Sequence, residues 1–244
     1  MKKIIFVVIV YSFGLNSTIN SQKKVALTSF WVSKHIGFEQ IGRNAGLVAA
    51  IASLSENPNF NLQPVLDNFY KTFTEEYSEN FPFELMAEED VIKRPEYIAY
   101  EGRFNEDAER SKLFQRYLSP KGYKPLVESL FKGEKSNQMQ MLKMFNDVDG
   151  VMFVSMGYEF IKKTVPFTAG VRAFVRIKLW NKEGKKVFAI NEYGISKKSV
   201  GIVGGIPIMN SEKLLPLCES ASEKLVLDLS KKIGKVTKKA AKKL

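Results

Sequence analysis

The sequence predicts an α/β or α+β domain in which a single mixed sheet of about four to six strands is flanked by helices. The first observation is the apolar run VMFVSM at residues 151–156, which follows the turn signal Asp149-Gly150 and is typical of a central strand covered on both faces. The second is a long hairpin at about residues 170–196, where apolar and polar side chains alternate. The third is a C-terminal stretch with apolar residues at helical spacing, which predicts a final helix.

Residues 1–21 predict a cleaved secretory signal peptide. A basic Lys2-Lys3 pair precedes a largely apolar segment at residues 4–15, and residues 16–21 are small and polar. The apolar segment is shorter than the ~18–20 residues of a membrane-spanning helix, so we expect cleavage after residue 21 instead of a retained anchor. The predicted localisation is therefore exported, either periplasmic or outer-membrane-associated.

The remaining chain is expected to form a single domain at residues 22–232 and a basic tail at residues 233–244. The net charge is +11, of which Lys2, Lys3 and seven lysines near the C-terminus supply nine, leaving about +2 for the body. A nearly neutral body makes nucleic acid an unlikely partner. The tail is either a basic amphipathic segment that contacts an anionic surface or a solvated end. The candidate contact lysines are Lys231, Lys232, Lys235, Lys238, Lys239, Lys242 and Lys243.

The first strand of the mature protein is predicted at residues 23–31. A glycine-bearing segment follows, with Gly37, Gly42 and Gly46. Arg43-Asn44 stands where a phosphate-binding loop has Lys followed by Ser or Thr. We therefore expect no nucleotide or other cofactor, and interpret the segment as a flexible or partner-contacting connection.

An amphipathic helix is predicted at residues 61–80, with Asn61 as its N-cap and Pro82 beyond its end. Residues 83–86 predict a short strand. The pattern is weaker after that point. Further helical segments are expected at residues 87–93, 107–118, 126–131 and 136–145.

The hairpin is closed by the turn NKEGK, whose glycine adopts positive φ readily. We expect Leu179 to lie opposite Val187. That register places Glu192 diagonally between Arg172 and Arg176 on the polar face, where opposite charges help to fix the pairing.

An apolar, glycine-rich stretch at residues 200–208 follows the hairpin. Two interpretations remain open. Gly201, Gly204 and Gly205 are candidate contacts to a membrane, a partner or an apolar ligand. Alternatively, the stretch is a tight crossover packed beneath the last helix.

The last helix begins after the cap signal Asn210-Ser211 and is expected to end at about residue 232. Cys218 lies on its apolar stripe and is the only cysteine of the chain. An internal disulfide is therefore excluded, and Cys218 is predicted to be a buried thiol.

Residues that commonly perform catalysis are scarce. His35 is the only histidine and is expected at a surface or loop position, which removes most hydrolase and metal constellations. Asp147 and Asp149 lack further oxygen ligands nearby, so no metal site is predicted. A hydrolase that uses two separated carboxylates remains the alternative function.

The order of these elements resembles the envelope α/β domains of the curli-secretion lipoprotein, the penicillin-binding-protein activator and the amino-terminal domain of TolB. The resemblance is carried by an Asp-Gly pair entering a central strand at residues 149–154, and by the hairpin turn at residues 181–185. It covers residues 23–60 and 136–232 and has no counterpart for residues 81–133; the lipidation cysteine is absent.

The resemblance implies an envelope binding and assembly module without catalysis, and it assigns no individual functional residue. Together with the predicted export signal and the scarce catalytic residues, it predicts a non-enzymatic exported protein that binds another envelope protein or an anionic surface component. Peripheral membrane contact through the basic tail is part of this expectation.

Overall fold

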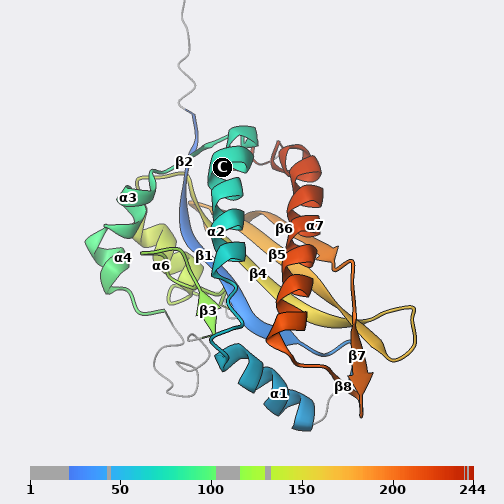
Figure 1. Ribbon diagram of the computed structural model, residues 1–244. Coiled ribbons are helices and arrows are strands. Elements are labelled where there is room, and N and C mark those ends of the chain that lie inside the picture. The colour runs from blue at the N-terminus through green and yellow to red at the C-terminus, as the bar shows by residue number, and fades with distance from the viewer. Residues whose placement is uncertain (1–21, 43–44, 103–115, 130–132, 239, 241) are drawn as a thin grey trace, which may run out of the picture.

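The computed structural model describes residues 22–42, 45–102, 116–129, 133–238, 240 and 242–244. Within these residues, eight strands form one mixed sheet, which confirms the predicted α/β class but exceeds the expected four to six strands (Figure 1). Their order is β2-β1-β4-β5-β7-β8, with β3 paired to β1 and β6 paired to β5. The strands are β1 (Lys24–Gly37), β2 (Glu84–Leu85), β3 (Tyr117–Leu118), β4 (Gly150–Lys162), β5 (Thr168–Asn181), β6 (Lys186–Ile195), β7 (Val200–Val203) and β8 (Ile206–Pro207).

Four long strands form the middle of the sheet. β1 and β4 pair in parallel, and β4, β5 and β6 continue as antiparallel neighbours. Both β1 and β4 are almost entirely buried over their first halves, as a parallel pair covered on both faces requires. The other four strands have only two to four residues, too few for an alternating pattern, and of these only β2 was expected, at residues 83–86.

The helices are α1 (Ala45–Glu56), α2 (Gln63–Lys71), the π-helical η1 (Thr72–Tyr77), the 3-10 helix η2 (Ser78–Asn80), α3 (Glu88–Ile92), α4 (Pro95–Ala99), α6 (Asn137–Met144) and α7 (Ser211–Thr237). The helix predicted at residues 61–80 is confirmed as the continuous run α2-η1-η2, but it begins at Gln63 with Leu62, not Asn61, at the N-cap position.

The helices predicted between residues 107 and 131 differ from the structure. Most of the segment 107–118 lies outside the described residues, and its last two residues form β3. Residues 126–129 are not helical. Hydrogen bonds from β1 hold this segment extended: Leu126 N donates to Ser29 Oγ (2.9 Å), and Trp31 Nε1 donates to the Leu126 carbonyl (3.1 Å).

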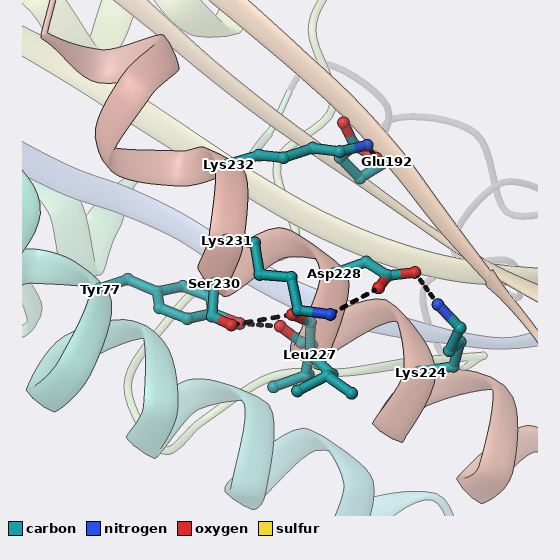
Figure 2. Close-up of polar contacts among 9 residues, drawn as sticks. Tyr77, Glu192, Lys224, Leu227, Asp228, Ser230, Lys231 and Lys232 are labelled. Carbon is teal, nitrogen blue, oxygen red and sulfur yellow. Dashed lines mark hydrogen bonds and ion pairs between the residues drawn. The ribbon is translucent and has the colours of Figure 1, made fainter.

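Two helices, α2 and α7, lie side by side over one face of the sheet (Figure 1). The Phe30 ring of β1 packs against Phe69 and Phe73, with ring centroids 5.1 and 5.6 Å apart. Tyr77 Oη donates to the Val226 carbonyl of α7 (2.6 Å), a contact drawn in the close-up of Figure 2. The buried aromatic cluster and this hydrogen bond join the two helices to the sheet.

The opposite face of the sheet is covered only in part. There, α6 packs against β4, and the ring centroids of Phe153 and Trp180 are 5.0 Å apart. Tyr97 of α4 donates from its hydroxyl to the Thr28 carbonyl (2.8 Å). This cover lies over the half of the sheet where β4 begins and β5 ends.

The predicted register of the hairpin is wrong by one residue. Leu179 lies opposite Phe188, and Trp180 lies opposite Lys186, so that Val187 is an extra residue in β6. Because side chains alternate along a strand, this bulge sends Glu192 to the face covered by α7. There Glu192 pairs with Lys232 of α7 (2.8 Å), as Figure 2 shows.

The C-terminus folds back onto the domain. α7 continues beyond residue 232 to Thr237, and Ile233 is buried. Ala240 is also buried, and Asn181 Nδ2 donates to the Lys243 carbonyl (2.9 Å). The segment predicted as a tail therefore contributes apolar contacts to the body, while its described lysines remain exposed.

Gly194 sets how closely α7 approaches the sheet. A Cβ at this position would lie 2.3 Å from Leu225 N and 2.4 Å from the Ala221 carbonyl oxygen, both backbone atoms of α7. We expect Gly194→Ala to lower the free energy of unfolding by about 3 kcal/mol, because a helix backbone cannot move aside as a side chain does. Urea unfolding measures the change. Gly133→Ala, where no atom of the described residues lies within 4 Å, is the control and should match the parent. Equal stability of both variants would contradict the expectation.

Candidate functional site

A groove crosses the face of the sheet opposite α2 and α7, and we call it the sheet groove. Side chains of β1, β4, β5 and β6 form its floor, with Tyr117 of β3 at one side. The Val175 side chain of β5 faces α7, and successive side chains of a strand point to opposite faces of the sheet. The groove therefore receives Arg172, Phe174 and Arg176 of β5. Its volume of about 530 Å³ is sufficient for a small molecule or a short peptide segment.

Aromatic rings supply much of the groove surface. The Trp31 and Tyr117 rings lie 4.4 Å apart between centroids, at an interplanar angle of 39°, and the hydrogen bond to Leu126 fixes the indole. The Phe174 ring lies over Gly157, where a Cβ would come within 2.7 Å of the Phe174 Cζ. The glycine therefore lets the ring lie directly on β4. Rings held in this way present fixed π faces to a ligand.

Two arginines give the groove its positive charge. Arg172 donates from Nε to Glu159 Oε1 (2.6 Å), and its guanidinium lies 5.5 Å from the centroid of the Tyr193 ring. The Arg176 guanidinium lies 4.8 Å from the centroid of the Phe174 ring. Arg176 is exposed, and no carboxylate among the described residues pairs with it. Arg176 is thus a cation available to an anionic ligand.

His35 lies in β1, so a loop position is wrong; its side chain is half-buried and lines the groove at the surface of the sheet. The pairing of β1 with β4 shifts between Val32 and Ile36, where β1 bulges, and Lys34 N donates across the other edge to the Arg116 carbonyl (2.7 Å). Burial lowers the pKa of His35, Arg116 lowers it further, and Glu39 opposes them. The imidazole is therefore uncharged at neutral pH, and its buried Nδ1 has no hydrogen-bond partner among the described residues.

Two carboxylates lie at one end of the groove. A Cβ on Gly37 would be 2.9 Å from Glu39 Oε2 and 3.4 Å from the Glu159 Cβ, so both acids border the same glycine. Glu159 is already bound by Arg172, whereas Glu39 is exposed. This end of the groove therefore combines a neutral imidazole with one ion-paired acid and one solvated acid.

The predicted contact glycines lie elsewhere, in the β7–β8 hairpin. Gly201 is half-buried in β7, and Gly204 and Gly205 are exposed at the turn, with φ values of 59° and 81°. Ile208 N–H donates to the Gly201 carbonyl (2.9 Å), which closes the hairpin. The stretch is therefore an exposed hairpin and not a crossover packed beneath α7.

The predicted contact lysines lie at the other end of α7. Lys231 pairs with Asp228 (3.6 Å), and Lys232 pairs with Glu192. Lys239 lies outside the described residues, and the other predicted lysines, Lys235, Lys238, Lys242 and Lys243, are exposed. Because α7 has 27 residues, about 40 Å of helix separates them from the β7–β8 hairpin. The structure does not bring the two predicted sets together.

Other reactive groups have structural partners. Cys218 is fully buried in α7, as predicted, and burial raises the pKa of its thiol well above the ordinary value. Arg94 binds both carboxylate oxygens of Asp147 (2.9 Å each) and holds the pKa of that group below its usual value. Asp149 accepts from Lys24 N (2.8 Å). Within the described ranges, no three His, Cys, Asp or Glu residues form a metal-ligand cluster.

Comparison with known proteins adds no relative: the chain matches no protein-family model and none of the curated sequences. In the described part of the chain, no helix has both the length and the apolar character required to cross a bilayer.

Much of the groove was missed by the sequence-based interpretation. The sequence does show Arg172, Phe174 and Arg176 on one face of the predicted strand. The aromatic Phe174 between two arginines was the signal that could have indicated a binding surface on that face. The contribution of His35 depends on the bulge in β1, and that of Tyr117 on a strand of two residues. Neither feature has a periodic pattern in the sequence.

Protonation of His35 is expected to destabilise the fold. Its folded-state pKa is lowered below the ordinary 6.5, so the stabilisation is complete above pH 6.5 and is lost as the pH falls toward the folded-state pKa, because the unfolded chain binds the proton more readily. Urea unfolding at a series of pH values should show a steeper loss of stability below about pH 6.5 in the parent than in His35→Gln. Parallel pH profiles would show that His35 does not titrate in this way.

Proposed function

We propose that this protein is a non-enzymatic binding module of the cell envelope, which holds an anionic, extended peptide segment of another envelope protein in the sheet groove. The observation that carries the proposal is the pairing of Arg176, a cation without a carboxylate partner among the described residues, with the aromatic surface of Phe174. A guanidinium binds carboxylates through two parallel hydrogen bonds, and aromatic faces bind the apolar part of a ligand.

The dimensions of the groove support a peptide. Its floor crosses four strands, which corresponds to about 14 Å at ~4.8 Å between neighbours. An extended chain covers that distance with about four residues. Ser33, Ser155 and Asn191 add hydroxyl and amide groups for hydrogen bonds to a peptide backbone.

The rigidity of the floor favours recognition. β4 and β5 are paired from Gly150–Asn181 to Lys162–Ala169 without a register shift. A binding surface on fixed strands loses less conformational entropy when it binds than one on loops. This property suits a module that holds a partner in place.

Export belongs to the same proposal and is supported by the sequence of residues 1–21. The exposed lysines at the end of α7 support attachment to an anionic surface component. Deletion of residues 231–244 is a poor test of that role, because it also removes the buried Ile233 and Ala240. Substitution of the exposed lysines by Gln keeps these contacts.

The groove proposal is tested by site-specific photo-crosslinking in the cells that produce the protein. A benzophenone side chain at Tyr193, which is 56% exposed, should crosslink an envelope protein, and the same group at Leu227, 54% exposed on α7, should not. Arg176→Glu should lower the Tyr193 crosslink about tenfold or more, since a charge reversal opposes an anionic segment. Equal crosslinking from both positions, or no effect of Arg176→Glu, would contradict the proposal.

A second candidate is a carboxylate-dependent hydrolase, because Glu39 and Glu159 border the same end of the groove. The ion pair between Glu159 and Arg172 favours the binding function, since it occupies the carboxylate with a structural partner. The hydrolase would be favoured if the protein cleaved peptide or glycan substrates and if this activity disappeared in each of the variants Glu39→Gln and Glu159→Gln.

A further inference from the structure

An exposed apolar surface lies at the end of the sheet where β4 turns into β5. Val165 and Phe167 of this turn are 60% and 82% exposed, and Val203 at the β7–β8 turn is 73% exposed. The two turns are neighbours, because β7 pairs with the first residues of β5 and Ile202 N donates to the Phe167 carbonyl (2.8 Å). We call residues 163–168 and 203–206 the apolar turns.

The β4–β5 turn is held in a fixed conformation. Lys163 N donates to the Thr168 carbonyl (3.2 Å), and Thr168 Oγ1 donates to the Val165 carbonyl (2.7 Å). Phe167 has φ of 56°, in the left-handed region that costs an L residue free energy. The chain thus holds a large apolar side chain in solvent on a strained backbone, and packing within the domain does not account for it.

Helix α1 is an uncharged neighbour of the β7–β8 hairpin. Residues 45–55 contain no charged side chain, and Val48 is 44% exposed. α1 lies beside β8 at this end of the molecule (Figure 1). The β4–β5 and β7–β8 turns therefore present apolar groups together, with α1 beside β8, and exposed apolar surface of this kind marks a docking site.

The chain segments that form the apolar turns carry lysines, and the nearest acids along the chain are Glu159, Glu192 and Glu212. Residues 160–171 and 193–211 contain four lysines and no Asp or Glu. Lys162, Lys197 and Lys198 are exposed, whereas Lys163 donates to the Ser196 carbonyl (2.8 Å). Apolar side chains at the tip and lysines at the base match the two layers of an anionic bilayer surface, which are acyl chains and phosphate headgroups.

We propose that the apolar turns dock the protein onto an anionic phospholipid surface. Phe167, Val165 and Val203 enter the interface, while Lys162, Lys197 and Lys198 contact the headgroup phosphates. This site does not depend on the sheet groove. It also places membrane contact at the opposite end of α7 from the lysines around residue 238.

The test is flotation of the purified full chain with phospholipid vesicles, after mass spectrometry has defined its amino terminus. The vesicles contain phosphatidylcholine alone or with about 30% phosphatidylglycerol, a composition chosen to give a negative surface potential. The test variant is Phe167→Asn with Val203→Thr. Asn tolerates the positive φ of Phe167, and Thr keeps the shape and strand preference of Val, so the fold is retained. Partitioning onto anionic vesicles should fall about tenfold or more.

The matched control is Ile98→Asn with Leu227→Thr, which removes apolar side chains that are 60% and 54% exposed elsewhere. This control should partition as the parent does. Lys238→Gln with Lys242→Gln and Lys243→Gln tests the proposed contact of the α7 lysines separately, and it should lower partitioning less than the turn variant does. Thermal unfolding of every variant verifies its fold. The proposal would be overturned if the parent did not bind anionic vesicles or bound uncharged vesicles equally well. It would also be overturned if the turn variant bound as the parent does, or if only the lysine variant lost binding.

Discussion

The structure depends on one constraint, which is that a single face of the hairpin β5–β6 is buried under α7. Ala173, Val175, Ile177 and Leu179 are fully buried on that face, and Gly194 lets the α7 backbone come within van der Waals distance of β6. Because successive side chains of a strand point to opposite faces, burial of these four residues fixes the direction of the side chains between them. Arg172, Phe174 and Arg176 must point to the other side, and the sheet groove exists because the cover on that side is incomplete.

The two proposed surfaces differ in chemistry. The groove combines a guanidinium, aromatic faces and hydrogen-bonding groups on a floor of paired strands, which suits a directional ligand with a defined charge. The apolar turns offer exposed aliphatic and aromatic groups above lysines, which suits a fluid surface without defined geometry. The two proposals therefore rest on different residues and can be tested independently.

Whether the sequence predicted a helix or strand depended on the length of that element. The long strands β4, β5 and β6, the run from α2 to η2 and the final helix all have enough residues to show a period, and each was predicted in type and approximate position. Cys218 was placed correctly because its neighbours repeat at helical spacing. The short strands β3, β7 and β8 were missed because a pair of residues, or even four, carries no periodic signal.

The sequence by itself determined the class of fold, the alternating character of the hairpin and the apolar stripe of α7, because these are local patterns of side chains along a regular backbone. Tertiary structure decided the register of β6, since the extra residue at Val187 is invisible in the pattern yet moves Glu192 to the opposite face. It also decided that His35 joins the groove and that the C-terminal segment packs on the body. The physical reason is that bulges and long-range contacts are fixed by what the whole domain buries, and no short window of sequence contains that information.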